Sequence, residues 1–456
     1  CFDTAVQPAR DGGGTSTTSR ARIRTARSAA GPFQPLGKRR GGVAAFCLSL
    51  ILTATSSAQI TYNWNGCAHN NMWDYGGTGC ELHWIEGGGA WVQVPANSGI
   101  IRVNNDQQAG TWDQNKSGLV VYQLWFDSGA GTARTITGNS LTFADYSGTD
   151  PKIENASAAT HTIDVGITGD ANDPLELNPV SGNLTFNGAI NNNGSWLNVY
   201  GNNGYSLTLG GVVSGSGGIA VKENSTVILS NNNTFSGSIW VEKGTVRLQT
   251  HINAMGTGPV NVGTNATLDI NYVGLHLRGV PLTLYNGQVT KTNATATYWD
   301  GAFTNYNSST VSVSGSGGFV IVSNISLASG TLVFSNAAAS GMGSGGTMTG
   351  PGNLIKQGLG TFSLYPGTHS GNIDLYQGEI RQLTGIMTGS GILTMSNATT
   401  YRTDGATTRT NTKAIVIKGN VTNGYVGGGT LIFTGTVNLN SGIRTITCPN
   451  TNTISG

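Results

Sequence analysis

The sequence contains few charged residues: Asp, Glu, Lys and Arg make up 10% of its 456 residues. The formal net charge is +2, but residues 1–58 hold eight of the 24 Lys and Arg and two of the 22 acids, so the remaining chain carries a charge of −4. No basic patch is left there to favour nucleic acid as a partner. Because 38% of residues are hydrophobic and self-repulsion is low, we expect a folded chain.

Sequence motifs that carry enzyme chemistry are also absent. There is no Gly-x-Ser-x-Gly elbow, P-loop, His-Glu-x-x-His or Cys-x-x-Cys. Gly341–Gly346 matches Gly-x-Gly-x-x-Gly, but Thr347–Pro351 cannot open the helix that a dinucleotide site requires. Four histidines stand in separate repeats, without a Ser or Cys and carboxylate pattern, and are expected to be solvated or core residues: His161, His251, His276 and His369. We therefore predict no catalytic residue and no cofactor.

Cysteine is scarce, with five in the chain, two of them within residues 1–58. Cys67 and Cys80 flank a short Gly-rich loop, so a disulfide between them is one interpretation. Zinc held with His69 and His83 is the alternative, although neither Cys-x-x-Cys nor a paired His motif is present. Cys448 has no evident partner and is expected to be a buried thiol.

The sequence has no apolar run of the roughly 20 residues that a membrane-spanning helix needs. Lys38–Arg40, the short apolar run Val43–Ala54 and the small residues Ser56–Ala58 instead predict a secretory signal peptide over residues 38–58, cleaved after Ala58. Residues 1–37 are then a non-structural upstream extension. A transit peptide is the alternative, because the Arg-rich start is nearly free of acids.

What the chain does contain is a repeat. The segment Ser214–Leu248 recurs in altered form at Thr349–Leu383, and weaker echoes run from about residue 115 to the end. The echoes alternate apolar and polar residues in short runs bounded by Gly, Asn or Ser, as in Ala266–Ile270, which is the strand signal. With 69 glycines in the chain, long helices are not expected.

The clearer copy resembles the autotransporter-associated β-strand repeat of bacterial surface and secreted proteins. The matching motifs are Gly215–Gly218, Asn233–Gly237 and Gly244–Val246. The second copy departs from the pattern, with Gly367–His369 in place of Asn-Thr-Phe and Gly378–Ile380 at the closing strand. The resemblance implies a passenger segment that is exported to the cell surface or secreted.

These patterns predict an all-β fold, a right-handed parallel β-helix or related β-solenoid over residues 115–456, with roughly 20 to 25 residues per coil. Val227 and Leu229 should point inward, and Thr226 and Ile228 outward. The final residues stop inside a strand-turn unit, so we expect a truncated C-terminus.

Residues 59–114 differ from the repeats because they concentrate tryptophan. One interpretation is an atypical N-terminal cap that covers the apolar end of the solenoid. The other is sugar stacking by exposed indoles, and the candidates are Trp64, Trp73, Trp84 and Trp91.

An acidic cluster is the best candidate for a cation or catalytic site: Asp164, Asp170, Asp173 and Glu176. Calcium prefers several oxygen ligands of this kind, but the spacing matches neither the EF-hand nor the Gly-Gly-x-Gly-x-Asp repeat. Because Asp, Asn and Pro also form ordinary turns, we predict a turn here, with calcium as the alternative.

The leading hypothesis for function is a non-enzymatic, surface-exposed or secreted scaffold for adhesion, with cell-surface or matrix glycans or proteins as partners. A polysaccharide lyase or hydrolase on a β-helix is the alternative. A carbohydrate-binding protein that uses the N-terminal tryptophans is a third.

Overall fold

The computed structural model describes residues 61–64, 84–86, 91–92, 99–103 and 110–455, apart from residues 273, 275, 278, 338 and 339. Contacts divide the chain into two units, residues 1–57 and 58–456, and every described residue belongs to the second. The predicted extension, signal peptide and Cys67–Cys80 pair lie outside the described residues, as does Trp73. The side chains of Trp64, Trp84 and Trp91 also lie outside them.

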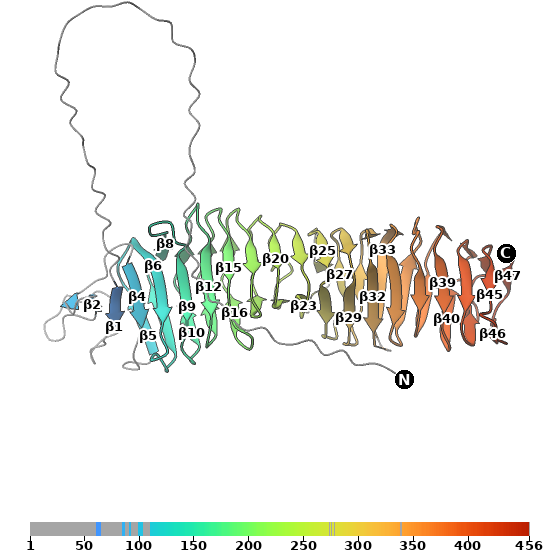
Figure 1. Ribbon diagram of the computed structural model, residues 1–456, viewed down its shortest axis with the longest axis horizontal. Coiled ribbons are helices and arrows are strands. Elements are labelled where there is room, and N and C mark those ends of the chain that lie inside the picture. Colours follow the sequence, from blue (N-terminus) through green and yellow to red (C-terminus); the bar gives the residue numbers. More distant parts are fainter. Residues whose placement is uncertain are drawn as a thin grey trace, which may run out of the picture. The chain divides into compact units, whose positions relative to one another are not determined.

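The described residues form β-strands joined by turns, in three sheets (Figure 1). The 16-stranded sheet contains β5 (Gly110–Gln114), β7 (Arg134–Gly138), β10 (His161–Ile163), β13 (Leu184–Phe186), β16 (Ser206–Leu209), β19 (Thr226–Leu229), β21 (Thr245–Leu248), β23 (Thr267–Ile270), β26 (Gln288–Lys291), β29 (Ser309–Val313), β32 (Thr331–Asn336), β34 (Asn353–Gln357), β36 (Ile373–Leu375), β39 (Ile392–Met395), β42 (Ala414–Ile417) and β45 (Val437–Asn438).

The 27-stranded sheet contains β1 (Thr61–Trp64), β2 (Trp84–Glu86), β3 (Trp91–Val92), β4 (Gly99–Val103), β6 (Leu119–Phe126), β8 (Leu141–Phe143), β9 (Lys152–Asn155), β11 (Ile167–Thr168), β12 (Leu175–Pro179), β14 (Ile190–Asn191), β15 (Leu197–Val199), β17 (Val213–Ser214), β18 (Ile219–Val221), β20 (Ile239–Val241), β22 (Val260–Val262), β24 (His276–Leu277), β25 (Leu282–Tyr285), β27 (Thr297–Trp299), β28 (Phe303–Tyr306), β30 (Phe319–Ile321), β31 (Ile325–Leu327), β33 (Gly341–Thr349), β35 (Thr361–Tyr365), β37 (Glu379–Gln382), β40 (Thr399–Thr403), β43 (Val421–Asn423) and β46 (Ile446–Thr447). The 4-stranded sheet contains β38 (Ile386–Met387), β41 (Arg409–Asn411), β44 (Leu431–Phe433) and β47 (Asn452–Ile454). Within the described ranges, no helix is long and apolar enough to cross a membrane.

The strands form a parallel β-solenoid of about 16 coils, because each coil contributes one strand to the 16-stranded sheet. Each of these strands pairs in parallel with the equivalent strand of the next coil, as β16 pairs with β19 and β19 with β21. Among the described strands, antiparallel pairing is confined to β1–β2 and β2–β3. The predicted all-β parallel solenoid is confirmed.

Apolar residues stack inside the solenoid in ladders that run from coil to coil. Leu184 pairs with Leu207, Leu207 with Val227 and Val227 with Val246, and all four side chains are fully buried. On β19, Val227 and Leu229 are buried while Thr226 and Ile228 are partly exposed, which confirms the predicted alternation. Full burial of each such side chain contributes about 1.5–3 kcal/mol, so the ladders supply the main stabilising term.

The Asn-Thr-Phe-Ser-Gly turn of the clearer repeat forms hydrogen bonds to the coils before and after it. The buried Asn233 side chain accepts a hydrogen bond from the Val213 backbone N–H (2.8 Å) and donates one to the Ala254 carbonyl oxygen (2.6 Å). Phe235, two residues later, is fully buried. Asparagine suits this corner because one amide satisfies a donor and an acceptor of the backbone on opposite sides.

In the second repeat, different side chains occupy the turn that corresponds to Asn233–Gly237. His369 occupies the place of Phe235 and is also fully buried, with its Nε2 2.7 Å from the Gly352 carbonyl oxygen. The buried Lys413 ammonium then donates to the carbonyl oxygens of His369 (2.6 Å) and Gly371 (3.1 Å). The departure from the repeat pattern therefore replaces an apolar corner with a hydrogen-bonded one.

Two further predictions can be compared with the fold. Gly341–Thr349 is strand β33, so the Gly-x-Gly-x-x-Gly match does not open a helix. The prediction that Cys448 is buried is wrong, because its thiol is free and exposed. Cys448 directly follows β46, on one of the last coils. Few side chains of these coils are buried inside the solenoid.

Candidate functional site

A row of residues on the outer side crosses five neighbouring strands of the 27-stranded sheet. In register, Glu176 of β12 pairs with Asn198 of β15, Asn198 with Ala220 of β18, Ala220 with Trp240 of β20, and Trp240 with Asn261 of β22. Ala220 has the smallest side chain of this row. The row is therefore hollowed at Ala220, between larger neighbours on the coils before and after it.

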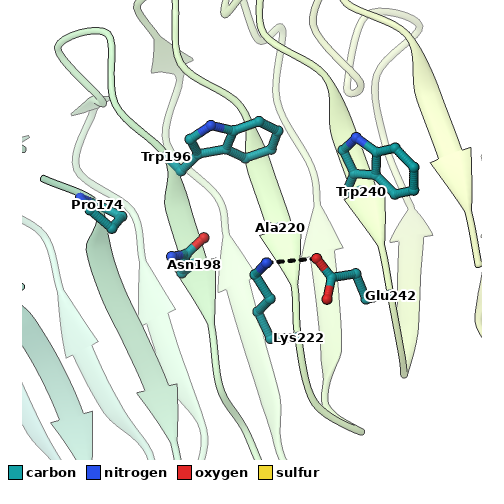
Figure 2. A pocket seen from close by; sticks show the side chains of 7 residues that line it. All are labelled: Pro174, Trp196, Asn198, Ala220, Lys222, Trp240 and Glu242. Carbon is teal, nitrogen blue, oxygen red and sulfur yellow. Dashed lines mark hydrogen bonds and ion pairs between the residues drawn. The ribbon is translucent and has the colours of Figure 1, made fainter. Parts of the chain in front are cut away.

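The hollow is a groove of about 400 Å³, shown in Figure 2. Its lining residues come from four successive coils: Pro174, Trp196, Asn198, Ala220, Lys222, Trp240 and Glu242. The indole rings of Trp196 and Trp240 lie on either side of Ala220 (Figure 2). A pocket of this size with aromatic walls and a few polar groups is typical of small-molecule binding sites.

The position of Trp196 depends on a glycine in the next coil. A Cβ atom at Gly218 would lie 2.6 Å from Cζ3 of the Trp196 ring and 2.3 Å from the Ser238 carbonyl oxygen. The indole ring of Trp196 therefore packs directly against the backbone of Gly218, in the Gly-Ser-Gly-Gly turn of the repeat, where any side chain would clash with the ring. It nevertheless remains 37% exposed, which leaves ring surface available beside the groove.

One edge of the groove carries a pair of opposite charges from neighbouring coils. Lys222 Nζ lies 2.6 Å from Glu242 Oε1, and both side chains are partly exposed (30% and 45%). A solvent-exposed pair of this kind contributes only about 0–1 kcal/mol to stability. The charges of the groove lining cancel, while their polar atoms remain within reach of a ligand.

The aromatic surface continues beyond the groove. The rings of Trp240 and Tyr285 stack with centroids 5.8 Å apart, and those of Tyr285 and Tyr306 with centroids 5.3 Å apart. The planes differ by 14° and 4° respectively, so the three rings are nearly parallel. Together with Trp196 they form what we call the aromatic ladder, which runs from the start of β15 to β28.

None of the aromatic-ladder residues was singled out from the sequence. The alternation in Ile239–Val241 already indicates that Trp240 points outward. Its proximity to Trp196, however, follows only from the coil-to-coil register, because the two residues belong to coils separated by β18.

The acidic cluster is only partly as predicted. Asp170 and Asp173 are brought together, and the structure adds Asp145, with carboxylate oxygens of all three within 4.8 Å of one another. Asp164 lies apart and accepts a hydrogen bond from Asn187 (2.8 Å). Glu176 lies in the outward row of β12. Asp145 was missed, although its distance of 25 residues from Asp170 is one coil.

Desolvation, together with the crowding of like charges, raises a carboxyl pKa in this cluster. Desolvation and then the carboxylates of Asp145, Asp170 and Asp150 raise the pKa of Asp173. Asp170 also accepts a hydrogen bond from the Asn172 backbone N–H (2.8 Å), as an ordinary Asx turn does. Three carboxylates supply only part of the roughly six to eight oxygen ligands that calcium takes, so calcium binding stays the alternative to the predicted turn.

The four histidines lie on different coils. His161 is buried, stacks on Phe126 with centroids 4.0 Å apart, and has its Nε2 2.7 Å from Ser157 Oγ. Burial, followed by the charge of Arg134, lowers the pKa of His161 to about 4. The pKa of His369 is likewise lowered to about 4, chiefly by burial. These two are core residues, as the sequence analysis expected.

The other two histidines lie nearer the surface. His276 is exposed, with its Nδ1 3.1 Å from Asp300 Oδ1. His251 accepts a hydrogen bond on Nδ1 from the Asn253 backbone N–H (3.1 Å). Both contacts are local arrangements that surface histidines commonly adopt.

Comparison with known proteins finds a similar sequence among bacterial adhesins. The chain is 27% identical over 236 residues to the adhesin BmaC autotransporter of Brucella suis biovar 1 (strain 1330). The match covers 48% of this chain but only 6% of that adhesin. No family model and no solved structure matches the chain. The chain is therefore a distant relative of an autotransporter adhesin, and its parallel β-solenoid fits the repeats of autotransporter passengers, as the repeat motifs predicted.

Proposed function

We propose that this chain is part of a passenger that is exported to the bacterial surface or secreted, where it serves as a scaffold for adhesion. The observation that carries the proposal is the stack of about 16 coils with an unbroken 16-stranded sheet. Such a stack presents a long, regular surface on rigid strands, which is what a display scaffold needs.

Two further points support the proposal. The relative found by comparison is named as an adhesin and an autotransporter, although the chain covers a small part of it. The apolar run and small residues before Gln59 have the pattern of a signal peptide. Both point to a location outside the cytoplasm.

The test is the accessibility of the protein on intact cells. Antibodies raised against the solenoid should label intact producing cells or detect the protein in the cell-free medium, and protease added to intact cells should remove any surface label. A periplasmic protein serves as the control and should stay protected. Labelling that appears only after the cells are broken would overturn the proposal.

A further inference from the structure

We infer that the groove at Ala220 and the adjoining aromatic ladder bind a linear, uncharged glycan. This inference deepens the proposed function and rests on it for its setting at a cell surface. The binding itself depends only on the residues that line the groove.

The chemistry of the groove lining matches that of a sugar. Two indole rings flank the hollow above Ala220, and Asn198 with the Lys222–Glu242 pair supply hydrogen-bonding groups between and beside them. A sugar ring has apolar C–H faces and a rim of hydroxyl groups. Its faces suit aromatic rings, and its rim suits amide, ammonium and carboxylate groups, each of which donates or accepts hydrogen bonds.

Aromatic rings recur along the stack of coils. The aromatic ladder extends over the successive strands β15, β18, β20, β22, β25 and β28. At about 4.8 Å between neighbouring strands, these six strands span roughly 24 Å. A single sugar would use one ring of the ladder, whereas a linear chain can contact several rings in succession. Repeated weak contacts of this kind add up along the same ligand.

The charges of the groove lining favour an uncharged ligand. Lys222 and Glu242 are the two charged residues of the groove lining and pair with each other. Glu176 lies in the same outward row, two coils from Ala220. A polyanionic glycan would meet two carboxylates and an ammonium group that is already paired, so the lining favours an uncharged chain.

The sheet geometry disfavours a peptide in its place. β18 is hydrogen-bonded to β15 on one side and to β20 on the other, so it offers no free edge to which a peptide strand could be added. The groove is also interrupted by Asn198 and the ion pair, whereas an amphipathic helix requires a continuous apolar groove.

The test is titration of the purified full-length chain with neutral hexasaccharides, namely cellohexaose, xylohexaose and mannohexaose, and with hexagalacturonate as the acidic probe. Calorimetry and intrinsic tryptophan fluorescence report binding. At least one neutral probe should bind saturably. Trp196→Ala and Trp240→Ala should each weaken that binding by about 10-fold or more, the loss expected of a central aromatic contact.

Two other variants make the test specific. Ala220→Gln should also weaken binding, because it fills the hollow without removing a ring. Tyr376→Ala removes an aromatic side chain that is 47% exposed outside the groove lining, and it should bind as the wild type does. Far-UV circular dichroism should be unchanged in all four variants, since none of these side chains belongs to the buried apolar cluster inside the solenoid. Melting temperature is measured for each variant, because Ala220 is only 2% exposed and its replacement by Gln tests the packing as well as the hollow.

Three outcomes would overturn the inference. They are no binding of any neutral hexasaccharide at millimolar concentration, binding of hexagalacturonate alone, and binding that Trp196→Ala, Trp240→Ala and Ala220→Gln leave intact. Failure of the surface-labelling experiment would instead count against the proposed location, because the titration uses the isolated protein.

Discussion

The Lys356 ammonium group lies inside the solenoid, where it donates a hydrogen bond to the carbonyl oxygen of Gly358 at 2.6 Å. It donates two more, to the carbonyl oxygens of Gln357 (2.7 Å) and Gln377 (3.3 Å), the latter from the next coil. A fully buried lysine is unusual, and it persists here because the coil corner offers three carbonyl oxygens in place of water.

This arrangement predicts a pH dependence of stability. Burial lowers the pKa of Lys356 to about 8, although Glu379 opposes the shift. Between pH 8 and about 10.4, its value in an unfolded chain, the unfolded state binds more protons, so the free energy of unfolding should rise with pH. The contribution of Lys356 to that rise is at most about 3 kcal/mol.

Denaturant titrations at pH 8 and pH 10 measure the effect. Lys356→Met should show a smaller rise than the wild type, whereas Lys243→Met, at an exposed lysine, should keep the wild-type rise. An equal rise in wild type and Lys356→Met would contradict the prediction.

Leu229→Ala should destabilise the solenoid locally. Leu229 is fully buried on β19, and removing a buried leucine typically costs about 2–5 kcal/mol. Because each coil contacts only its neighbours, hydrogen exchange should accelerate in β16, β19 and β21 and not along the whole stack. Ile228→Ala, on the outward side of the same strand, is the control. Uniform loss of protection across residues 115–455 would argue for a single cooperative fold.

Gly217→Ala should be poorly tolerated. A Cβ atom at this position would lie 1.6 Å from the Ser195 carbonyl oxygen of the preceding coil, so two coils would have to move apart. We expect a loss of about 1–3 kcal/mol or more, as for other overpacked sites. Gly405→Ala is the matched control, because a Cβ atom added there would meet nothing within 4 Å. Equal melting temperatures for the two variants would refute the steric explanation.

The enzyme hypothesis can be tested at the acidic cluster. We expect the purified protein to release no unsaturated or reducing sugar ends from pectin or alginate. Ultraviolet absorbance and a reducing-sugar assay measure the two products. Turnover that Asp170→Ala or Asp173→Ala abolishes would reverse this expectation and favour a lyase or hydrolase.

Processing of the N-terminus is a separate prediction. In a bacterial host, the exported protein should begin at or near Gln59, because the signal-peptide pattern ends at Ala58. Amino-terminal sequencing of the exported product measures this. Finding residues 20–37 on that product would rule out the predicted cleavage.

The strands and their inward faces could be predicted because a period of two fixes which side chains share a face. Val227 and Leu229 illustrate this, and no knowledge of coil length was needed. The groove could not be predicted in the same way, since only the register of successive coils places Trp196 and Trp240 along the same groove. The number of residues per coil varies: within the 16-stranded sheet, paired residues are separated by 19 residues at Val227 and Val246 but by 27 at Thr135 and Thr162.

The same dependence on the coil-to-coil register explains why Asp145 was not predicted to lie beside Asp170, which belongs to the next coil. Lys356 could not be predicted for a different reason. Its side-chain chemistry favours solvent, and only the three carbonyl oxygens of a particular corner make an inside position acceptable.

The pairing of each coil with only its two neighbours also governs how the solenoid responds to force. Hydrogen bonds between coils run along the stacking direction, so tension applied along the stack pulls on them directly instead of shearing them. Coils should then detach singly from the loaded end and rejoin when the load falls. A solenoid under flow would lengthen stepwise and dissipate the load, while the coils that hold the aromatic ladder stay folded until those outside them have opened.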